Sequence, residues 1–495
     1  MTEPQSLPAW GILTAIAYAG SWLIVIGSLF IIPRNRRPGS ATAWLLLMVL
    51  LPYLGLPLYW LIGSPKLSRR RRALQRTMDA RIAAGVAAAR HDPVLAPLID
   101  PPIPPRYEPF VRLTANLSGM PACIGNRVQL LPGYDEAIRR MTEAVKAARK
   151  FVHVEFYIVA ADATTDPFIT ALEDAVRRGV KVRMLLDHFG TRKFPGWRRV
   201  IARLTAAGVD WHWSLPLRPF SNQWNRPDLR NHRKVLVIDG EVGFTGSMNM
   251  IARSYLLRRN RRLGLYYVDL HARVTGPVVA ELDAAFQTDW YSETTELLSP
   301  PRIPPEAAPP DTDSMCQVLP SGSGYDDDNN LKVFVGLIHA ARERLVITSP
   351  YFVPDDALMT AITSAAQRGV RVTLYSSAIA DQYLVYHAQR SYYEQLLVAG
   401  VEIRLLRKPA LLHAKHLTVD DDIAVIGSSN LDMRSLTLNL EITLLTYDRD
   451  VVAELREVEA EYAAHSDPVE LQAWRRRPLT SQLLNNLARL TAALQ

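Results

Sequence analysis

Two segments of this 495-residue chain carry the same polar residues in the same order. Their sequences are NHRKVLVIDGEVGFTGSMN at 231–249 and LHAKHLTVDDDIAVIGSSN at 412–430. Six positions match at one offset of 181 residues (413 minus 232): His232/His413, Lys234/Lys415, Asp239/Asp420, Gly246/Gly427, Ser247/Ser428 and Asn249/Asn430. One matching histidine would be uninformative, whereas six matches at one offset indicate an internal duplication that retained its polar residues.

The spacing in each segment predicts that these polar residues meet at one edge of a strand. Residues two apart on a strand share a face, so each histidine points the same way as the lysine that follows it. Asp239-Gly240 is a strong hairpin signal and Asp420-Asp421 a weaker one at the equivalent place. Folding each segment about that two-residue turn sets Ser247 opposite His232 and Ser428 opposite His413, with Asn249 and Asn430 just beyond. Asp239 and Asp420 lie an odd seven residues from their histidines, so we expect them to face away and to serve the turns.

This set of side chains suits a phosphodiester substrate. Lysine supplies a positive charge, and serine and asparagine supply donors for the non-bridging oxygens. Histidine can act as nucleophile or as acid and base near neutral pH. Two half-sites would place two histidines across one phosphate, one attacking phosphorus while the other protonates the leaving oxygen and then activates the acceptor. No carboxylate cluster with metal-ligand spacing accompanies them, so we expect the lysines to replace a metal ion and expect no cofactor.

The surrounding sequence predicts the α/β fold class. Strand and helix patterns alternate from about residue 106, and they recur. FVHVEFYIVA (151–160) and GVKVRMLLD (179–187) are echoed by RLVITSPYFV (344–353) and GVRVTLYSS (369–377). We therefore expect two similar halves related by pseudo-twofold symmetry, 106–296 and 313–495, joined by a proline-rich linker at 297–312.

The N-terminal region is predicted to anchor the chain in a membrane. Residues 10–32 form an uncharged apolar run long enough to cross about 30 Å of hydrocarbon, and a second run follows at 41–62. Within residues 1–64 the second run either crosses as well or, because Pro52, Gly55 and Pro57 interrupt it, dips in and returns. Positive residues lie on both sides of the second run, and either arrangement leaves the basic membrane-proximal linker 65–105 and all that follows in the cytoplasm. Two buried helices of a soluble core are the alternative.

Composition limits the partners. The net charge of +8 (57 Lys and Arg against 49 Asp and Glu) indicates an anionic partner, either nucleic acid or lipid. Two cysteines, Cys123 and Cys316, are too few for a disulfide framework or a four-thiolate zinc site, and we expect both to be buried. The predicted anchor favours anionic membrane lipid over nucleic acid.

The motifs resemble a known family. HRKVLVIDGEVGFTGSMN and HAKHLTVDDDIAVIGSSN match the duplicated HKD motif of the phospholipase D superfamily. RRPGSATAWLLLMVLLPYLGLPLYWLIG (36–63), ITSPYFVPDD (347–356) and SSNLDMRSLTLNLE (428–441) are similar to bacterial cardiolipin synthases. The resemblance implies a phosphatidyltransferase in which one phosphatidylglycerol donates its phosphatidyl group to a histidine, releasing glycerol, and a second phosphatidylglycerol accepts it.

Site residues follow from the resemblance by position. It implies that the catalytic motif residues are His232, Lys234, Asp239, His413, Lys415 and Asp420, with Ser247, Asn249, Ser428 and Asn430 supporting the phosphate. In the superfamily an acidic residue downstream of the asparagine orients a histidine, and Glu441, 11 residues after Asn430, fits. The same offset in the first half falls on Asn260, so Asp269 is the candidate there. We take His232 as the nucleophile, although the symmetry of the motifs supplies no physical reason to prefer either histidine.

Two further segments carry predictions. IARSYLLRRNRR (251–262) and YYVDLHARVTGP (266–277) depart from the family pattern, which leaves the recognition of the acceptor open. LTSQLLNNLARLTAAL (479–494) predicts an amphipathic helix that packs on the catalytic domain, with membrane contact as the alternative.

Other activities remain as alternatives. A hydrolytic phospholipase D would differ only in using water as the acceptor. A nuclease is disfavoured by the predicted anchor, and a non-catalytic membrane scaffold is disfavoured because both copies of the motif are intact. The sequence carries no signal for the oligomeric state.

Overall fold

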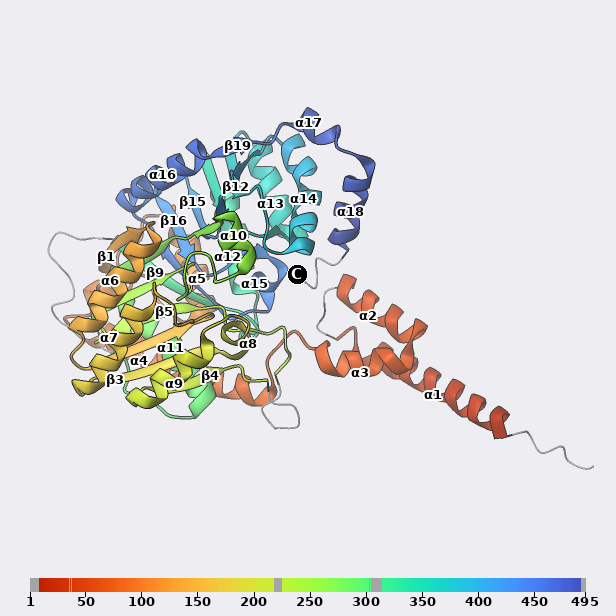
Figure 1. Cartoon of the computed structure of the whole chain (residues 1–495), viewed down its shortest axis with the longest axis horizontal. Helices are drawn as coiled ribbons and strands as arrows, with labels where there is room; N and C mark the ends of the chain where they lie inside the picture. The colour runs from red at the N-terminus through yellow and green to blue at the C-terminus, as the bar shows by residue number, and fades with distance from the viewer. Residues whose placement is uncertain are drawn as a thin grey trace, which may run out of the picture. The chain divides into compact units, whose positions relative to one another are not determined.

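The computed structural model describes residues 9–34, 36, 38–217, 225–301, 303 and 314–490 (Figure 1). The chain divides into two compact units, Met1–Pro65 and Lys66–Gln495. Most of the predicted linker at 297–312 lies outside the described residues.

The first unit consists of three apolar helices, α1 (Ala9–Ile31), α2 (Pro38–Leu50) and α3 (Pro52–Ile62). Within α1, Trp10–Ile31 is long and apolar enough to cross a membrane, and few of its side chains are buried. The apolar run at 41–62 is broken at Leu51, because Pro52 has no N–H to continue a helix and instead begins α3. At 1.5 Å per residue neither α2 nor α3 reaches about 30 Å. This break favours the arrangement in which the second run dips in and returns.

The second unit is built on a 15-stranded sheet with the order β19-β13-β12-β10-β15-β16-β18-β9-β1-β8-β6-β5-β2-β3-β4. The strands of the first half are β1 (Cys123–Leu131), β2 (Phe151–Phe156), β3 (Lys181–Asp187), β4 (Asp210–Ser214), β5 (Lys234–Ile238), β6 (Val242–Gly246) and β8 (His271–Thr275). Those of the second half are β9 (Ser314–Ser321), β10 (Arg344–Thr348), β12 (Arg371–Ser377), β13 (Glu402–Leu406), β15 (His416–Val419), β16 (Ile423–Gly427), β18 (Glu441–Thr446) and β19 (Ser466–Pro468). Four shorter strands form two separate pairs, β7 (Tyr266–Val268) with β14 (Ala410–Leu412) and β11 (Phe352–Val353) with β17 (Leu431–Asp432).

The strand order is symmetric about its centre. There β1 and β9 pair antiparallel, and Cys123 lies opposite Cys316. Moving outward, β8, β6, β5, β2, β3 and β4 correspond in order to β18, β16, β15, β10, β12 and β13. The predicted α/β class and the two similar halves with pseudo-twofold symmetry are confirmed. Both cysteines are buried and free.

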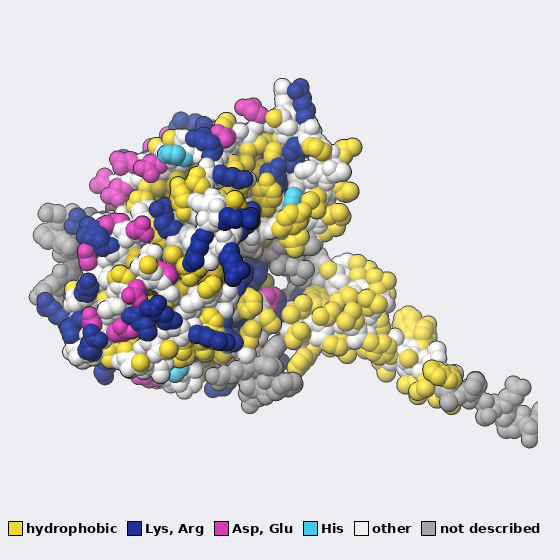
Figure 2. Space-filling view, in the orientation of Figure 1, with side chains coloured by type: hydrophobic (Ala, Val, Ile, Leu, Met, Phe, Trp, Pro, Cys, Tyr) yellow, Lys and Arg dark blue, Asp and Glu magenta, His cyan; other side chains and the backbone are white. Residues whose placement is uncertain are grey.

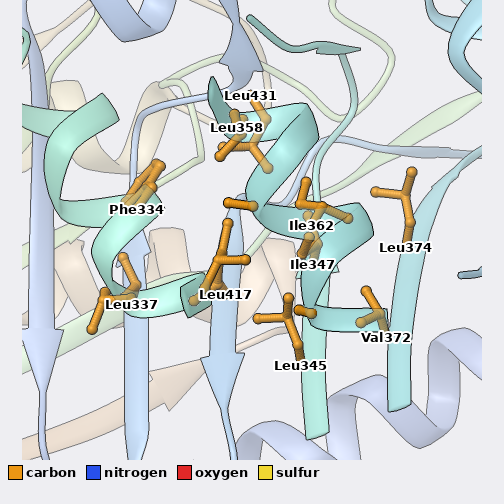
Figure 3. Close-up of a cluster of buried hydrophobic side chains, with 14 of the residues drawn as sticks. Phe334, Leu337, Leu345, Ile347, Leu358, Ile362, Val372, Leu374, Leu417 and Leu431 are labelled. Carbon is orange, nitrogen blue, oxygen red and sulfur yellow. The ribbon is translucent and has the colours of Figure 1, made fainter. Parts of the chain in front are cut away.

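Helices cover both faces of this sheet. The first half carries α5 (Glu108–Ser118), α6 (Tyr134–Ala147), α7 (Asp166–Arg177), α8 (His188–Arg192), α9 (Trp197–Ala207), α10 (Arg258–Leu263) and α11 (Val278–Thr294). The second carries α12 (Asn329–Ala340), α13 (Asp356–Gln367), α14 (Tyr383–Val398), α15 (Met433–Thr437), α16 (Arg449–Ala464), α17 (Leu471–Arg475) and α18 (Leu479–Arg489). Figure 3 shows the core of the second half, where Phe334 of α12 and Ile362 of α13 lie against Leu345 and Ile347 of β10 and Leu417 of β15. On the opposite face, α11 packs against strands of the first half and against β9, and α16 packs against strands of the second half and against β1.

The basic segment after the first unit is part of the folded core. It forms α4 (Arg69–His91), followed by a 3-10 turn at Ala96–Leu98. Arg71 is buried and donates to both carboxylate oxygens of Glu293 on α11, at 2.8 and 2.7 Å. Helix α4 therefore packs on the sheet-bearing unit through a buried ion pair.

The hairpins that carry the duplicated motifs differ from the predicted register by one residue. The turn at Asp239-Gly240 is present, since Glu241 N donates to Ile238 O at 2.9 Å. However, Ile238 pairs with Val242, so Glu241 is an extra, unpaired residue. In the second hairpin Val419 pairs with Ile423, which gives the same shift. The prediction that Ser247 lies opposite His232 and Ser428 opposite His413 is wrong, because a bulge beside each turn advances the returning strand by one residue.

Candidate active site

The two histidines lie immediately before the paired strands, and each is held by a carboxylate from the opposite half. His232 Nδ1 lies 3.0 Å from Glu441 Oε2, and His413 Nδ1 lies 2.6 Å from Asp269 Oδ1. All four side chains are buried. Glu441 begins β18 in the second half and Asp269 follows β7 in the first. The two half-sites are therefore interlocked, and each histidine needs a residue of the other half.

Backbone pairing explains this exchange. The chain ahead of His413 runs as β14 beside β7, with Leu412 opposite Val268, and His413 N donates to Val268 O at 2.7 Å. The equivalent pairing in the other direction is the bridge of Asn231 with Leu440, where His232 N donates to Leu440 O at 2.9 Å. Each motif thus begins beside a segment of the partner half, next to the residue that precedes the partner's carboxylate.

The serines support the carboxylates. Ser247 Oγ donates to Asp269 Oδ1 at 2.7 Å, and Ser428 Oγ donates to Glu441 Oε2 at 2.5 Å. Because each serine belongs to the same half as its carboxylate, it acts on the histidine of the other half. The one-residue shift in register leaves this arrangement intact, since both serines follow the last paired residue of β6 or β16.

The electrostatics favour a neutral imidazole beside an ionised carboxylate. Burial lowers the pKa of His232 to about 4 and also lowers the pKa of His413. Burial alone would raise the pKa of Asp269, but its interaction and hydrogen bond with His413 and the charge of Lys415 outweigh burial and bring that pKa to about 2. The pKa of Glu441 is likewise lowered against burial by His232. A neutral ring whose Nδ1–H donates to the carboxylate leaves Nε2 with a free lone pair.

The two lysines are buried next to the backbone of the histidines. Each Nζ donates to the backbone carbonyl of its own histidine, Lys234 to His232 and Lys415 to His413. Burial lowers the pKa of Lys234 to about 7 and that of Lys415 to about 8. Two charged lysines and two carboxylates balance to zero around neutral histidines, so a phosphodiester anion that enters adds a negative charge and favours the protonated form of the lysines and of one histidine.

The two asparagines differ in their contacts. Asn249 Oδ1 accepts from Ile158 N at 3.3 Å, and its Nδ2 donates to Tyr255 Oη at 2.9 Å. Asn430 is buried, and within the described part of the chain its Oδ1 has no hydrogen-bond partner. In the absence of substrate the second half therefore holds an unsatisfied hydrogen-bond acceptor, as a site for a substrate hydroxyl would require.

Asp239 and Asp420 lie at the far ends of the hairpins. Asp239 accepts from the backbone N–H groups of residues 149–151 at 2.7 to 2.8 Å. Asp420 accepts from those of residues 342–344 at 2.8 to 3.3 Å. Both have positive φ, 55° and 50°. The structure does not bring these two motif residues to the histidines; they tie the turns to neighbouring strands.

Aromatic side chains surround the histidines, and sequence reasoning missed them. Tyr157 packs edge-on to His232 with ring centroids 4.9 Å apart. Tyr267 and Tyr255 lie 5.5 and 5.9 Å from His413 and 4.0 Å from each other. Tyr255 and Tyr267 belong to the region in which the sequence departs from the family pattern, and that departure was the available signal.

A buried polar network lies behind His232 and was also missed. Asn231 Nδ2 donates to Glu155 and, at 3.1 Å, to Asp289 Oδ2, while Arg233 Nη1 donates to Asp289 Oδ2 at 2.6 Å. Arg233 Nε also donates to the Glu441 carbonyl at 3.0 Å. Burial and the neighbouring Asp289 raise the pKa of Glu155 well above its usual range. Charged residues flanking a motif histidine carry no periodic signal, so only the fold reveals their convergence.

Among the residues that the structure describes, no three His, Cys, Asp or Glu side chains are grouped so that they could hold a metal ion.

Comparison with known proteins places this geometry in context. Residues 141–290 and 334–461 match the family model described as "Cardiolipin synthase, PLD-like domain", and residues 21–64 match "Phospholipase_D-nuclease N-terminal". The chain is 34% identical to cardiolipin synthase A of Proteus mirabilis, covering 98% of each chain. It is 33% identical to cardiolipin synthase A of Yersinia pseudotuberculosis, covering 96% of this chain and 97% of that one.

A solved structure shares the fold. The crystal structure of phosphatidylserine synthase from Haemophilus influenzae matches with a TM-score of 0.55 at 17% identity, covering 77% of this chain and 98% of that chain. At that identity the likeness concerns the fold alone.

Proposed function

This chain belongs to the family of phospholipase D-like cardiolipin synthases, a membrane-associated family, and from that membership we propose that it joins two phosphatidylglycerol molecules into cardiolipin and glycerol. It is a phosphatidyltransferase that acts on membrane phospholipid. The observation that carries the proposal is the interlocked pair of histidines, each with Nδ1 held by a carboxylate of the opposite half. Two histidines in this state serve a double displacement, one as nucleophile and one as acid and base.

In the first step His232 is the nucleophile. Its Nε2 attacks phosphorus of the donor lipid, the P–N bond forms, and the P–O bond to the headgroup glycerol breaks. His413 gives its proton to the departing glycerol oxygen. Lys234 and Lys415, with Asn430, hold the non-bridging oxygens and stabilise the charge that develops on them.

In the second step the acceptor lipid takes the phosphatidyl group. His413, now neutral, removes the proton from a glycerol hydroxyl of the second phosphatidylglycerol. The resulting oxygen attacks phosphorus, the P–N bond breaks, and His232 is restored. Two phosphatidylglycerols give one cardiolipin and one glycerol, with no co-reactant and no cofactor.

The assignment of roles rests on an asymmetry between the pairs. Burial lowers the pKa of both histidines, that of His232 to about 4, which keeps its Nε2 unprotonated at neutral pH; the asymmetry lies in the carboxylates that hold them. Asp269 lies closer to His413, at 2.6 Å, and its low pKa provides a firm counter-ion for an imidazolium. These features support His232 as nucleophile and His413 as acid.

The reaction is tested with purified full-length protein and phosphatidylglycerol vesicles. Cardiolipin and glycerol in equal amounts support the transferase. Phosphatidic acid and glycerol without cardiolipin would mean that water is the acceptor and that the chain is a hydrolytic phospholipase D.

The two histidine roles are tested with a phosphatidyl donor carrying p-nitrophenol. This leaving group needs no proton, so His413→Asn should still release a burst of one p-nitrophenolate per site, whereas His232→Asn should release none. A burst from His232→Asn and none from His413→Asn would reverse the assignment.

We also propose a topology in which α1 spans the membrane, α2 and α3 re-enter without crossing, and the catalytic unit lies in the cytoplasm. The basic residues around residues 34–37 and 66–72 and the break at Leu51 support it. Single cysteines placed at Ser64 and, on the other side of α1, at Thr2 should react with an impermeant maleimide from opposite sides of the membrane. Labelling of both from the same side would contradict it.

A further inference from the structure

The C-terminal helix α18 exposes a stripe of leucines, while its two buried residues are Asn485 and Ala488. Leu479, Leu483, Leu487 and Leu490 are 52 to 80% exposed. At 100° per residue these four fall within about 80° of the helix circumference. The opposite side packs on α14, where Asn485 is buried and its Oδ1 lies 2.8 Å from His387 Nδ1. Four exposed leucines along one side of a helix form an apolar stripe, and such a stripe calls for an apolar partner.

A second, basic element lies on the same unit. Helix α10 has the sequence RRNRRL, and Arg258, Arg259, Arg261 and Arg262 are all exposed, together with Leu263. The surrounding segment 251–265 contains no Asp or Glu. In the described part of the chain, no carboxylate lies within ion-pair distance of these four guanidinium groups. This concentration of positive charge is available to an anionic partner.

The two elements are joined by the loop that precedes α14, and that loop touches the active site. Arg259 Nη1 donates to Ala380 O at 3.4 Å. Tyr267, whose ring packs against His413, donates to Asp381 Oδ2 at 2.9 Å. Just beyond, Tyr383 and Leu384 are 66 and 53% exposed at the start of α14. Figure 2 shows the Lys and Arg side chains gathered over α10 beside hydrophobic side chains over α14 and α18.

We propose that α10, the start of α14 and α18 form one docking surface that seats the catalytic unit on an anionic lipid bilayer. The docking surface comprises Arg258, Arg261, Arg262, Tyr383, Leu384 and the four leucines of α18. The leucines enter the boundary between headgroups and acyl chains, and the arginines bind lipid phosphates beside them. The inference rests on the proposed function in one respect, that the substrate is drawn from the bilayer.

Several features favour a bilayer over a second copy of this chain. The docking surface combines exposed leucines, a tyrosine and unneutralised arginines, which is the composition of an interfacial helix. A copy related by a twofold axis would bring the arginines of α10 toward one another or toward the leucines, without acidic residues of α10 to meet them. Since the loop 378–382 connects the surface to Tyr267 and His413, docking places the site beside the headgroups that it must reach.

Depth-dependent quenching tests the contact without requiring turnover. Full-length protein with Leu487→Cys carries a bimane label and is reconstituted in phosphatidylglycerol–phosphatidylcholine vesicles that contain nitroxide-labelled lipid. The matched control is Val398→Cys, 59% exposed at the other end of α14. The buried Cys123 and Cys316 do not compete for the label. We expect strong quenching at residue 487 and little at residue 398, and equal quenching at both would overturn the proposal. In a parallel sample of Leu487→Cys with pyrene in place of bimane, excimer fluorescence would mean that the leucine stripe binds a second copy of the chain, which would also overturn it.

Activity measurements test whether docking serves the reaction. Leu483→Asp with Leu487→Asp, and separately the Arg258, Arg261 and Arg262→Gln triple variant, should raise the apparent KM for phosphatidylglycerol in vesicles. Each arginine should contribute about fivefold, which is the fold-change for about 1 kcal/mol per basic residue near an anionic surface. Their kcat/KM for a short-chain phosphatidylglycerol below its micelle concentration should be unchanged, which also shows that they fold.

The control for charge is the Arg127, Arg149 and Arg449→Gln triple variant, whose arginines are exposed on other elements. This variant should change neither the apparent KM for phosphatidylglycerol in vesicles nor the kcat/KM for the short-chain lipid. An equal rise in KM for the control, or no rise for the docking-surface variants, would overturn the proposal. If vesicles yield phosphatidic acid only, the proposed transferase fails, while the quenching result still decides the docking surface.

Discussion

The two halves of the catalytic unit share their chemistry and differ in what surrounds it. In the second half the carboxylate that orients a histidine, Glu441, follows Asn430 by 11 residues; in the first half Asp269 follows Asn249 by 20. The nine additional residues accommodate α10 and bring Tyr255 and Tyr267 against His413. His232 has Tyr157 beside it instead. The two halves share a symmetric set of histidine, lysine, serine and carboxylate, and the longer segment of the first half adds Tyr255 and Tyr267 beside His413.

The largest effect should come from removing either histidine. His232→Ala and His413→Ala should each lower kcat with phosphatidylglycerol by about 10⁴-fold or more, because each takes part in both steps. The double variant should lose little beyond either single one. Product formation followed by lipid chromatography measures this, and a single variant with full activity would show that the two halves do not act as one site.

The exchange of carboxylates between halves makes a sharper comparison. Asp269→Asn and Glu441→Gln should each lower kcat by about 10²- to 10⁴-fold, by analogy with loss of the aspartate that orients a catalytic histidine. Because Asp269 holds the acid His413, the kcat of Asp269→Asn should recover with the p-nitrophenyl donor, whose leaving group needs no proton. Glu441 holds the nucleophile His232, so the kcat of Glu441→Gln should not recover with this donor. The opposite pattern of recovery would mean that each carboxylate serves its own half.

The lysines predict the pH dependence of substrate binding. Burial lowers the pKa of Lys234 to about 7 and of Lys415 to about 8, so the charged form that binds phosphate is present below these values and is lost above them. The apparent KM should therefore rise about tenfold per pH unit for each lysine above pH 8. In Lys234→Arg and in Lys415→Arg the substituted side chain stays charged, so each variant should lose the tenfold rise in KM per pH unit that its lysine contributes, even where kcat falls. A KM that is flat from pH 7 to 9 in the unaltered protein would contradict it.

The smallest effect on catalysis should come from the two turn aspartates. Asp239→Ala and Asp420→Ala each leave three backbone N–H groups without their acceptor, and each should lower the free energy of unfolding by about 1–3 kcal/mol. The two losses should be similar, because the two copies make the same contacts. Thermal unfolding of the purified protein measures the loss, and kcat at a temperature well below unfolding should change less than about twofold. A large fall in kcat without loss of stability would place these aspartates in the chemistry.

Much of the fold could be predicted because it is written in local patterns and in their repetition. The recurrence of two strand-and-helix units and the offset of 181 residues between the motifs were sufficient for two α/β halves. The hairpin turn at Asp239-Gly240 was also predictable from residue types, but the bulge at Glu241 was not. A bulge has no residue signature of its own here, since Glu241 is compatible with either a paired or an unpaired position.

The sequence by itself determined which side chains the chemistry uses, since residue type and a repeated offset single out His232, Lys234, His413 and Lys415. Only the tertiary structure decided how they work together, because Glu441 and Asp269 reach the opposite histidines through strand pairings between halves more than 140 residues apart in sequence. The outward face of α18 was decided in the same way. An amphipathic pattern fixes which residues share a face, but the contact with α14 selects which face is buried; there Asn485 and Ala488 are buried and four leucines are left outside.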